Sequence, residues 1–168
     1  STSTTEHAVE ALSAYIPIDR RRALVCAEPL PDRTHGAVLF AAISGFTPLT
    51  AALAAELGPL RGAEELTRQL NRVFGALIAE VERYGGSVIG FSGDGITCWF
   101  DDSSSEFSVL SSELEQAATQ NSVLKTQNSA ALRAVACALA MQGAMRQFAA
   151  IVTPAGSAVA LGIKVAVA

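Results

Sequence analysis

Two short stretches carry residues whose types and spacing could do chemistry. The first, Ser44-Gly45-Phe46-Thr47, follows an apolar run and precedes a helical pattern. The backbone N–H groups of such a loop, with the N-terminus of the next helix, favour an anion such as a triphosphate. The second is the turn Gly93-Asp94-Gly95, which places one carboxylate between two apolar segments. A carboxylate beside a phosphate-binding loop suits a Mg²⁺ site, although taken alone such a turn is more often only a hairpin turn.

The residues on either side of the first loop predict a strand before it and a helix after it. Residues 36–43 form a near-continuous apolar run, which predicts a buried strand. Thr47 is predicted as the N-cap of the next helix, with Pro48 in its first turn, where a missing N–H costs nothing. Gly58 and Pro59 interrupt that helix.

A second helix is predicted over about 62–83, where Tyr84-Gly85-Gly86 ends it. Residues 87–100 read as strand, Gly-Asp-Gly turn and strand, which is a hairpin. The helix shows a one-sided apolar stripe at spacings of three and four: Leu66, Leu70, Val73, Phe74, Leu77, Ile78 and Val81.

The last part of the chain predicts a helix over 130–151 and a final strand over 158–167. Four residues of this helix are expected to face inward: Leu132, Val135, Leu139 and Phe148. The predicted order is β-α-α-β-β-α-β, an α/β (α+β) fold of ferredoxin-like type with two helices on one face of a mixed sheet. Residues 1–35 are predicted as a lead-in helix and linker, and 36–168 as the domain.

Residues 101–129 do not fit this order. The segment is rich in Ser, Gln and Asn, and Asp101 and Asp102 at its start are expected to be solvated. A heptad spacing runs through it and into the next helix: Leu110, Leu114, Ala117, Asn121, Leu124, Asn128, Ala131 and Val135. Three interpretations stay open: a flexible insertion with accidental periodicity, a helical or coiled-coil element, and an engineered graft.

Composition limits the function classes. The chain of 168 residues is 50% hydrophobic and 17% charged, with a net charge of −4, which excludes a disordered chain and a nucleic-acid surface. The basic run Arg20–Arg22 is interpreted as a solvated helix face. His7 and His35 have no paired ligand or nucleophile nearby and are interpreted as structural.

The cysteines and the two chain termini bear on the cellular compartment of the protein. Cys26, Cys98 and Cys137 are far apart and odd in number, so neither a zinc site nor a disulfide framework is indicated. Cys98 and Cys137 are expected to be reduced core residues, which predicts a cytoplasmic protein. The N-terminus is polar and unlike a signal peptide, and the apolar C-terminal stretch is too interrupted for a membrane span. Because that stretch stops on an apolar strand, the sequence also predicts a truncated C-terminus.

Taken together, the motifs resemble a known family. The stretch "GAVLFAAISGFTPLT", the following helix, the Tyr-Gly-Gly and the Gly-Asp-Gly turn are similar to the catalytic domain of class III adenylate/guanylate cyclases of the bacterial type. The resemblance covers residues 36–100 closely and resumes at "ALRAVACALAMQGAM". It implies a lyase of cyclic nucleotide biosynthesis, in intracellular signal transduction, that converts ATP or GTP into a 3′,5′-cyclic nucleotide and pyrophosphate with Mg²⁺ or Mn²⁺.

The resemblance also implies roles for residues. Asp94 matches the second metal-binding aspartate, and the backbone carbonyl of Ile43 matches a further metal ligand. The stretch Ser44, Gly45, Phe46 and Thr47 matches the triphosphate loop. Ala42 stands where the first metal-binding aspartate belongs, and Gly90 stands where the family often has a base-reading lysine. The family's other base-recognising and transition-state residues would follow residue 168.

These departures predict low or absent activity, because two divalent ions need at least two anionic ligands. The alternative is a catalytically degenerate nucleotide-binding or dimerisation module that regulates a partner, since cyclase domains work as homodimers or heterodimers. A GGDEF-type cyclase is disfavoured because the acidic pair after the turn is missing. The sequence does not decide between ATP and GTP, nor does it name the regulatory signal.

Overall fold

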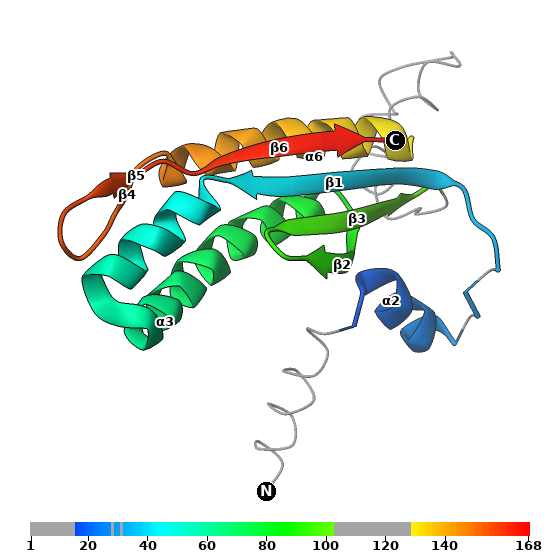
Figure 1. Cartoon of the computed structure of the whole chain (residues 1–168). Helices are drawn as coiled ribbons and strands as arrows, with labels where there is room; N and C mark the ends of the chain where they lie inside the picture. Colours follow the sequence, from blue (N-terminus) through cyan, green and yellow to red (C-terminus); the bar gives the residue numbers. More distant parts are fainter. Residues whose placement is uncertain (1–15, 28, 31, 103–128) are drawn as a thin grey trace, which may run out of the picture.

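A computed structural model describes residues 16–27, 29–30, 32–102 and 129–168. The predicted insertion therefore lies almost wholly outside the described residues, as does His7. Figure 1 shows the elements in chain order. They are α2 (Ile18–Cys26), β1 (Gly36–Ser44), α3 (Phe46–Arg83), β2 (Ser87–Ser92), β3 (Gly95–Asp101), α6 (Ala130–Ala144), the 3₁₀ helix η2 (Met145–Phe148), β4 (Ile151–Val152), β5 (Ala158–Val159) and β6 (Gly162–Val167).

The main sheet has four strands in the order β2-β3-β1-β6, and β4 and β5 form a separate hairpin. The predicted combination of helices with a sheet is confirmed. The mixed sheet is a wrong prediction, because every neighbouring pair of the four strands is antiparallel. The turn at Gly93 and Asp94 joins β2 to β3 as predicted, since antiparallel neighbours need only a short connection.

Strand β1 is buried on one face only. Ala37, Leu39, Ala41 and Ile43 are at most 3% exposed and lie in the core that helices α3 and α6 cover. The alternate residues point to the other face of the sheet, where Phe40 is 42% exposed. The predicted buried strand is therefore confirmed for one of its faces only, because the described helices cover a single face. This uncovered side, with Phe40, Ala42, Thr97, Trp99 and Lys164, is called the open face below.

Helix α3 changes direction where the sequence predicts an interruption. Gly58 has φ 78° and ψ 171°, and Pro59 follows it, so two helical segments meet at a kink that is visible in Figure 1. The predicted apolar stripe of the second segment is confirmed: Val73, Leu77 and Val81 are fully buried, and Leu66, Leu70 and Phe74 pack against the core.

Helix α6 is shorter than predicted and is rotated relative to the prediction. It ends at Ala144, and η2 and the β4–β5 hairpin occupy the following residues. Leu132, Val135 and Leu139 are 43%, 45% and 70% exposed, so their predicted inward orientation is wrong. Phe148 is buried as predicted, although it lies in η2. The buried face consists of Ala130, Arg133, Ala134, Cys137 and Met141.

Arg133 explains the rotation of α6. Its guanidinium donates hydrogen bonds to the carbonyls of Tyr84 and Gly85 at 3.1 and 3.0 Å, and to the carbonyl of Asp101. It also lies 5.9 Å from the centre of the Phe100 ring. A buried guanidinium with these partners fixes the inward face, and an Ala-rich helix adapts to it.

The two aspartates that end β3 are not merely solvated, contrary to the sequence prediction. Asp101 Oδ1 accepts a hydrogen bond from Thr34 Oγ1 at 3.0 Å. Asp102 Oδ1 accepts one from the N–H of Ala130 at 2.9 Å, and the N–H of Asp102 donates to the carbonyl of His35. These contacts connect the end of β3 to the start of α6.

Cys98 and Cys137 are buried free thiols, as predicted for reduced core residues. Burial raises the pKa of each thiol to about 12, so both stay protonated at neutral pH. Within the described ranges, the chain has no helix whose length and apolar character would allow it to cross a bilayer.

Candidate functional site

The candidate phosphate loop begins where β1 meets α3. The N-cap of α3 is Gly45 with φ 88°, so the predicted capping role of Thr47 is wrong. Thr47 lies in the first turn and is exposed. A Cβ on Gly45 would lie 2.2 Å from the carbonyl oxygen of Ala160, which excludes any side chain there. Because glycine has no side chain with which to cap the helix, the N–H groups of Phe46 and Thr47 have no partner within the helix and can meet an anion.

The structure brings this loop and the Asp94 turn together. The N–H of Ile43 donates to the carbonyl of Asp94 at 2.9 Å, and Ala42 stands directly opposite Gly95. In an extended strand the N–H and C=O of one residue point to the same side, so the Ile43 carbonyl also faces the Asp94 turn. Two motifs about 50 residues apart in the chain therefore meet at one edge of the open face.

Ala42 lies on the open face between β3 and β6. It is half-buried and pairs with Gly95 on one side and with Lys164 on the other. A methyl group therefore stands where the resemblance places a carboxylate, opposite Gly95, the residue that follows the half-buried Asp94. The described residues contain no group of three or more His, Cys, Asp or Glu side chains able to hold a metal ion. One carboxylate and one carbonyl suit at most a single weakly held ion, so the donor set does not fit two divalent ions.

Lys164 is a further candidate site residue that the sequence alone did not indicate. It is exposed, and its pairing with Ala42 brings the two Cβ atoms to about 4.5–5.5 Å on the same face. It is the one charged residue within residues 158–167, and a single lysine in an apolar strand could have signalled it. An ammonium at this place adds positive charge beside the phosphate loop.

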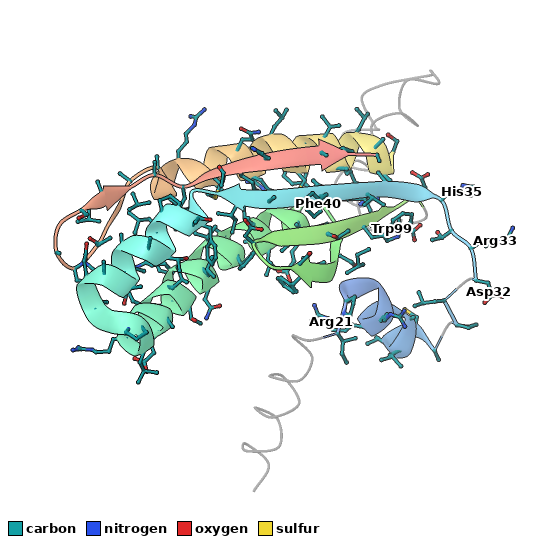
Figure 2. The ribbon with its side chains drawn as sticks, in the orientation of Figure 1. Arg21, Asp32, Arg33, His35, Phe40 and Trp99 are labelled. Atoms are coloured by element: carbon teal, nitrogen blue, oxygen red, sulfur yellow. The ribbon has the colours of Figure 1, made fainter. Side chains whose placement is uncertain are left out.

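Two aromatic residues, Phe40 and Trp99, lie on the rest of the open face. An added Cβ on Gly95 would lie 3.1 Å from the Phe40 ring, so the ring packs against this glycine next to Asp94. Trp99 lies on the neighbouring strand, directly opposite Val38 (Figure 2). Gly90 pairs with Thr97, and a Cβ added there would meet no atom within 4 Å. The open face therefore joins an apolar surface to the loop that favours an anion.

Comparisons with known proteins agree with this description. No family model matches the chain. Residues of the chain are 35% identical over 68 positions to adenylate cyclase type 10 of Homo sapiens, and 29% identical over 96 positions to the Rattus norvegicus protein. These matches cover 40% and 54% of the chain but only 4% and 6% of the relatives.

The fold has a solved counterpart in a bacterial light-regulated adenylyl cyclase. The TM-score is 0.61 at 18% sequence identity, and the match covers 99% of this chain and 41% of that one. The resemblance to class III nucleotide cyclase domains is thus confirmed for the fold and for a local stretch of sequence.

Proposed function

We propose that the chain is the catalytic-type domain of a class III nucleotide cyclase, in a form with little or no activity. The complete reaction would convert ATP or GTP into a 3′,5′-cyclic nucleotide and pyrophosphate, in cyclic-nucleotide signalling in the cytoplasm. The backbone hydrogen bond between Ile43 and Asp94 carries this proposal, because it holds the turn that bears the one aspartate of the site next to the candidate phosphate loop.

The chain's own residues have separate tasks in this proposal. The N–H groups at the start of α3, after Gly45, would hold the triphosphate, and Lys164 would approach it from β6. Asp94 and the Ile43 carbonyl would hold one Mg²⁺ or Mn²⁺. Such an ion stabilises charge on the attacking and leaving oxygens when the ribose 3′-oxygen displaces pyrophosphate from the α-phosphorus.

The missing carboxylate at Ala42 accounts for the proposed loss of activity. Each 1.4 kcal/mol of lost transition-state stabilisation lowers a rate about tenfold, and an ion contributes several kcal/mol. A loss of about three orders of magnitude or more is therefore expected relative to a domain with both carboxylates.

The test is cyclase activity with Mn²⁺ and ATP or GTP, measured on the domain extended past residue 168 with and without Ala42→Asp. Ala42→Asp, which restores the second carboxylate, is expected to raise turnover by about three orders of magnitude. Ala166→Asp is the matched control, because it adds the same charge to the same face one residue pair away, opposite Phe40. Robust turnover by the sequence with Ala42 would contradict the proposal of an inactive form.

A second candidate is a nucleotide-binding or dimerisation module that regulates a partner domain. The open face favours it, since Phe40 is 42% exposed and the anion-favouring loop is intact without Ala42 contributing a ligand. In this case ATP or GTP would bind without turnover, and a homodimer or heterodimer would form through the open face.

Calorimetric binding of ATP and GTP in EDTA separates the two candidates. The second candidate, a nucleotide-binding module, is supported if binding persists without metal and weakens about threefold to fivefold in Lys164→Gln. That size of effect is expected for a partly exposed charge pair. The control is Arg61→Gln, an exposed cation on α3 that lies outside the site. A strict monomer that binds neither nucleotide would contradict this second candidate.

A further inference from the structure

Lys164 is the only cationic side chain on the strands of the described main sheet, and it stands beside the position of the missing carboxylate. Strands β1, β2 and β3 contain no lysine or arginine, and β6 contains Lys164 alone. It lies directly opposite Ala42 and is exposed. Among the described residues, no carboxylate forms an ion pair with it, so its charge is available to a ligand.

The register between β1 and β6 places Lys164 within reach of the candidate phosphate loop. Ser44, the first residue of that loop, pairs with Gly162, two residues before Lys164. A Cβ added to Gly162 would lie 2.8 Å from the Ser44 Oγ, so this hydroxyl stands over Gly162 on the open face. Diagonal cross-strand neighbours such as Ser44 and Lys164 lie about 7–8 Å apart, a distance that a long side chain spans. The Lys164 ammonium can therefore extend toward the loop.

The alanine at position 42 changes the charge that a nucleotide would meet at this site. Two carboxylates without metal would repel a triphosphate, so a site built from them depends on divalent ions. Here the site has one carboxylate, that of Asp94, and one ammonium, that of Lys164, and these two charges cancel. The N–H groups at the start of α3 add a positive potential. The charges of this site therefore suit a phosphate chain better than a pair of metal ions.

We propose that Lys164 takes the place of a divalent ion, so that the site prefers a nucleoside triphosphate without Mg²⁺ over its Mg²⁺ complex. The inference rests on the second candidate of the proposed function, nucleotide binding at this loop. Free ATP carries about four negative charges at neutral pH and its Mg²⁺ complex about two, so the free form attracts the ammonium more strongly. A divalent ion on the phosphates would also stand near the ammonium, and like charges repel. Lys164 thus determines which form of the nucleotide binds.

The test measures the dissociation constant of ATP for the whole chain by calorimetry, once in EDTA and once with saturating Mg²⁺. The parent is expected to bind ATP about fivefold more tightly in EDTA, which is the size of effect expected for charges near an exposed lysine. Lys164→Gln is expected to make the two constants nearly equal, while Lys164→Arg keeps the difference because it keeps the charge. Arg61→Gln, an exposed cation outside the site, is the control that should also keep it.

Three outcomes would overturn the inference, and they differ in what they say about the proposed function. Tighter binding of ATP in Mg²⁺ than in EDTA would overturn the inference and leave nucleotide binding in place. A preference for EDTA that persists unchanged in Lys164→Gln would overturn the role of Lys164 alone. If ATP binds under neither condition, the second candidate of the proposed function fails and this inference fails with it.

Ala42→Asp gives an independent check of the same inference. The added carboxylate supplies a second anionic ligand beside Asp94, so Mg²⁺ is expected to strengthen ATP binding to this variant instead of weakening it. Calorimetry under the same two conditions measures the change. A variant that still binds ATP about fivefold more tightly in EDTA would show that position 42 does not set the preference, and would overturn the inference.

Discussion

At the scale of single residues, Gly45 shows how tightly the candidate site is built. Its φ of 88° lies in the left-handed region, and the Ala160 carbonyl occupies the space that a side chain would need. The loop that favours an anion is therefore fixed by contacts with the residues before β6 as well as by its own sequence.

Gly45→Ala is predicted to destabilise the domain by about 2 kcal/mol or more, since the left-handed conformation alone costs about 1–2 kcal/mol. The control is Gly75→Ala, within α3, where an added Cβ meets no atom within 4 Å. That change should stabilise the helix by about 0.5–1 kcal/mol. Urea midpoints of both variants check the prediction, and equal midpoints would contradict it.

The sequence predicted some site residues better than others, for physical reasons. The Gly93-Asp94-Gly95 turn depends on local backbone preferences, so the hairpin was predictable. Lys164 was missed because its place opposite Ala42 depends on the register between β1 and β6, strands that are about 120 residues apart. Thr47 was predicted as the N-cap from its residue type. The N-cap is Gly45 instead, because the Ala160 carbonyl lies so close that no side chain fits at this position.

At the scale of elements, Arg133 joins three parts of the chain. Its guanidinium connects the end of α3 at Tyr84 and Gly85 with the end of β3 at Asp101, from the first turn of α6. The same contact explains why the rotation of α6 could not be predicted. Leu132, Val135 and Leu139 form as regular an apolar row as the true inward face, and only the carbonyls that Arg133 meets distinguish the two.

Arg133→Met is predicted to destabilise the domain by about 3 kcal/mol, because three backbone carbonyls lose a charged donor in a site where Arg133 is 4% exposed. Arg133→Lys should recover only part of the loss, since one ammonium cannot reproduce the planar fork. Thermal and urea unfolding of the two variants provide the measurement. A methionine variant as stable as the parent would contradict the prediction.

Glu56 connects α3 to the β4–β5 hairpin. Its Oε1 accepts from Thr153 Oγ1 at 2.6 Å, and its Oε2 accepts from the N–H of Ala155 at 3.0 Å. These hydrogen bonds hold the pKa of the Glu56 carboxyl below its ordinary value of 4.5, and the bond from Thr153 has the largest effect.

The sign of the pH effect follows from that direction. The carboxyl of Glu56 takes up a proton more readily in the unfolded chain than in the folded one. Its contribution to the stability of the folded domain is therefore complete above its ordinary pKa of about 4.5, and it is lost as the pH falls through the lowered pKa. Glu56→Gln should therefore show a smaller fall in melting temperature between pH 5 and pH 3 than the parent. Glu64→Gln, an exposed glutamate on the same helix, is the control. Parallel curves for Glu56→Gln and the parent would contradict the role of Glu56.

At the scale of the whole molecule, the two sides of the sheet differ. Among the described residues, helices α3 and α6 bury one side of the sheet, while Phe40 is exposed on the open face beside the candidate site (Figures 1 and 2). The general architecture was predictable because the periodicity of α3 and of the hairpin is strong. The open face was not, because a run such as "GAVLFAAI" is typical of a strand buried on both sides.

If the domain assembles through the open face, Phe40→Asp is predicted to shift it toward the monomer, with at least about a tenfold weaker dimer, because a charge would be buried in the interface. Val152→Asp, on β4 at 65% exposure, is the control for adding a surface charge. Sedimentation velocity across a range of concentrations measures the effect. Identical sedimentation of both variants and the parent would rule out the open face as the interface.

The hydrogen bond between Asp102 and Ala130 has a consequence for evolution and engineering. It fixes the end of β3 next to the start of α6. The positions of these two ends therefore do not depend on how many residues join them. Doubling the length of a flexible loop costs only about 0.6 kcal/mol in closure entropy. This junction is therefore a place where a lineage can gain or lose sequence, or where a sensor domain can be inserted, without disturbing the sheet that carries Asp94.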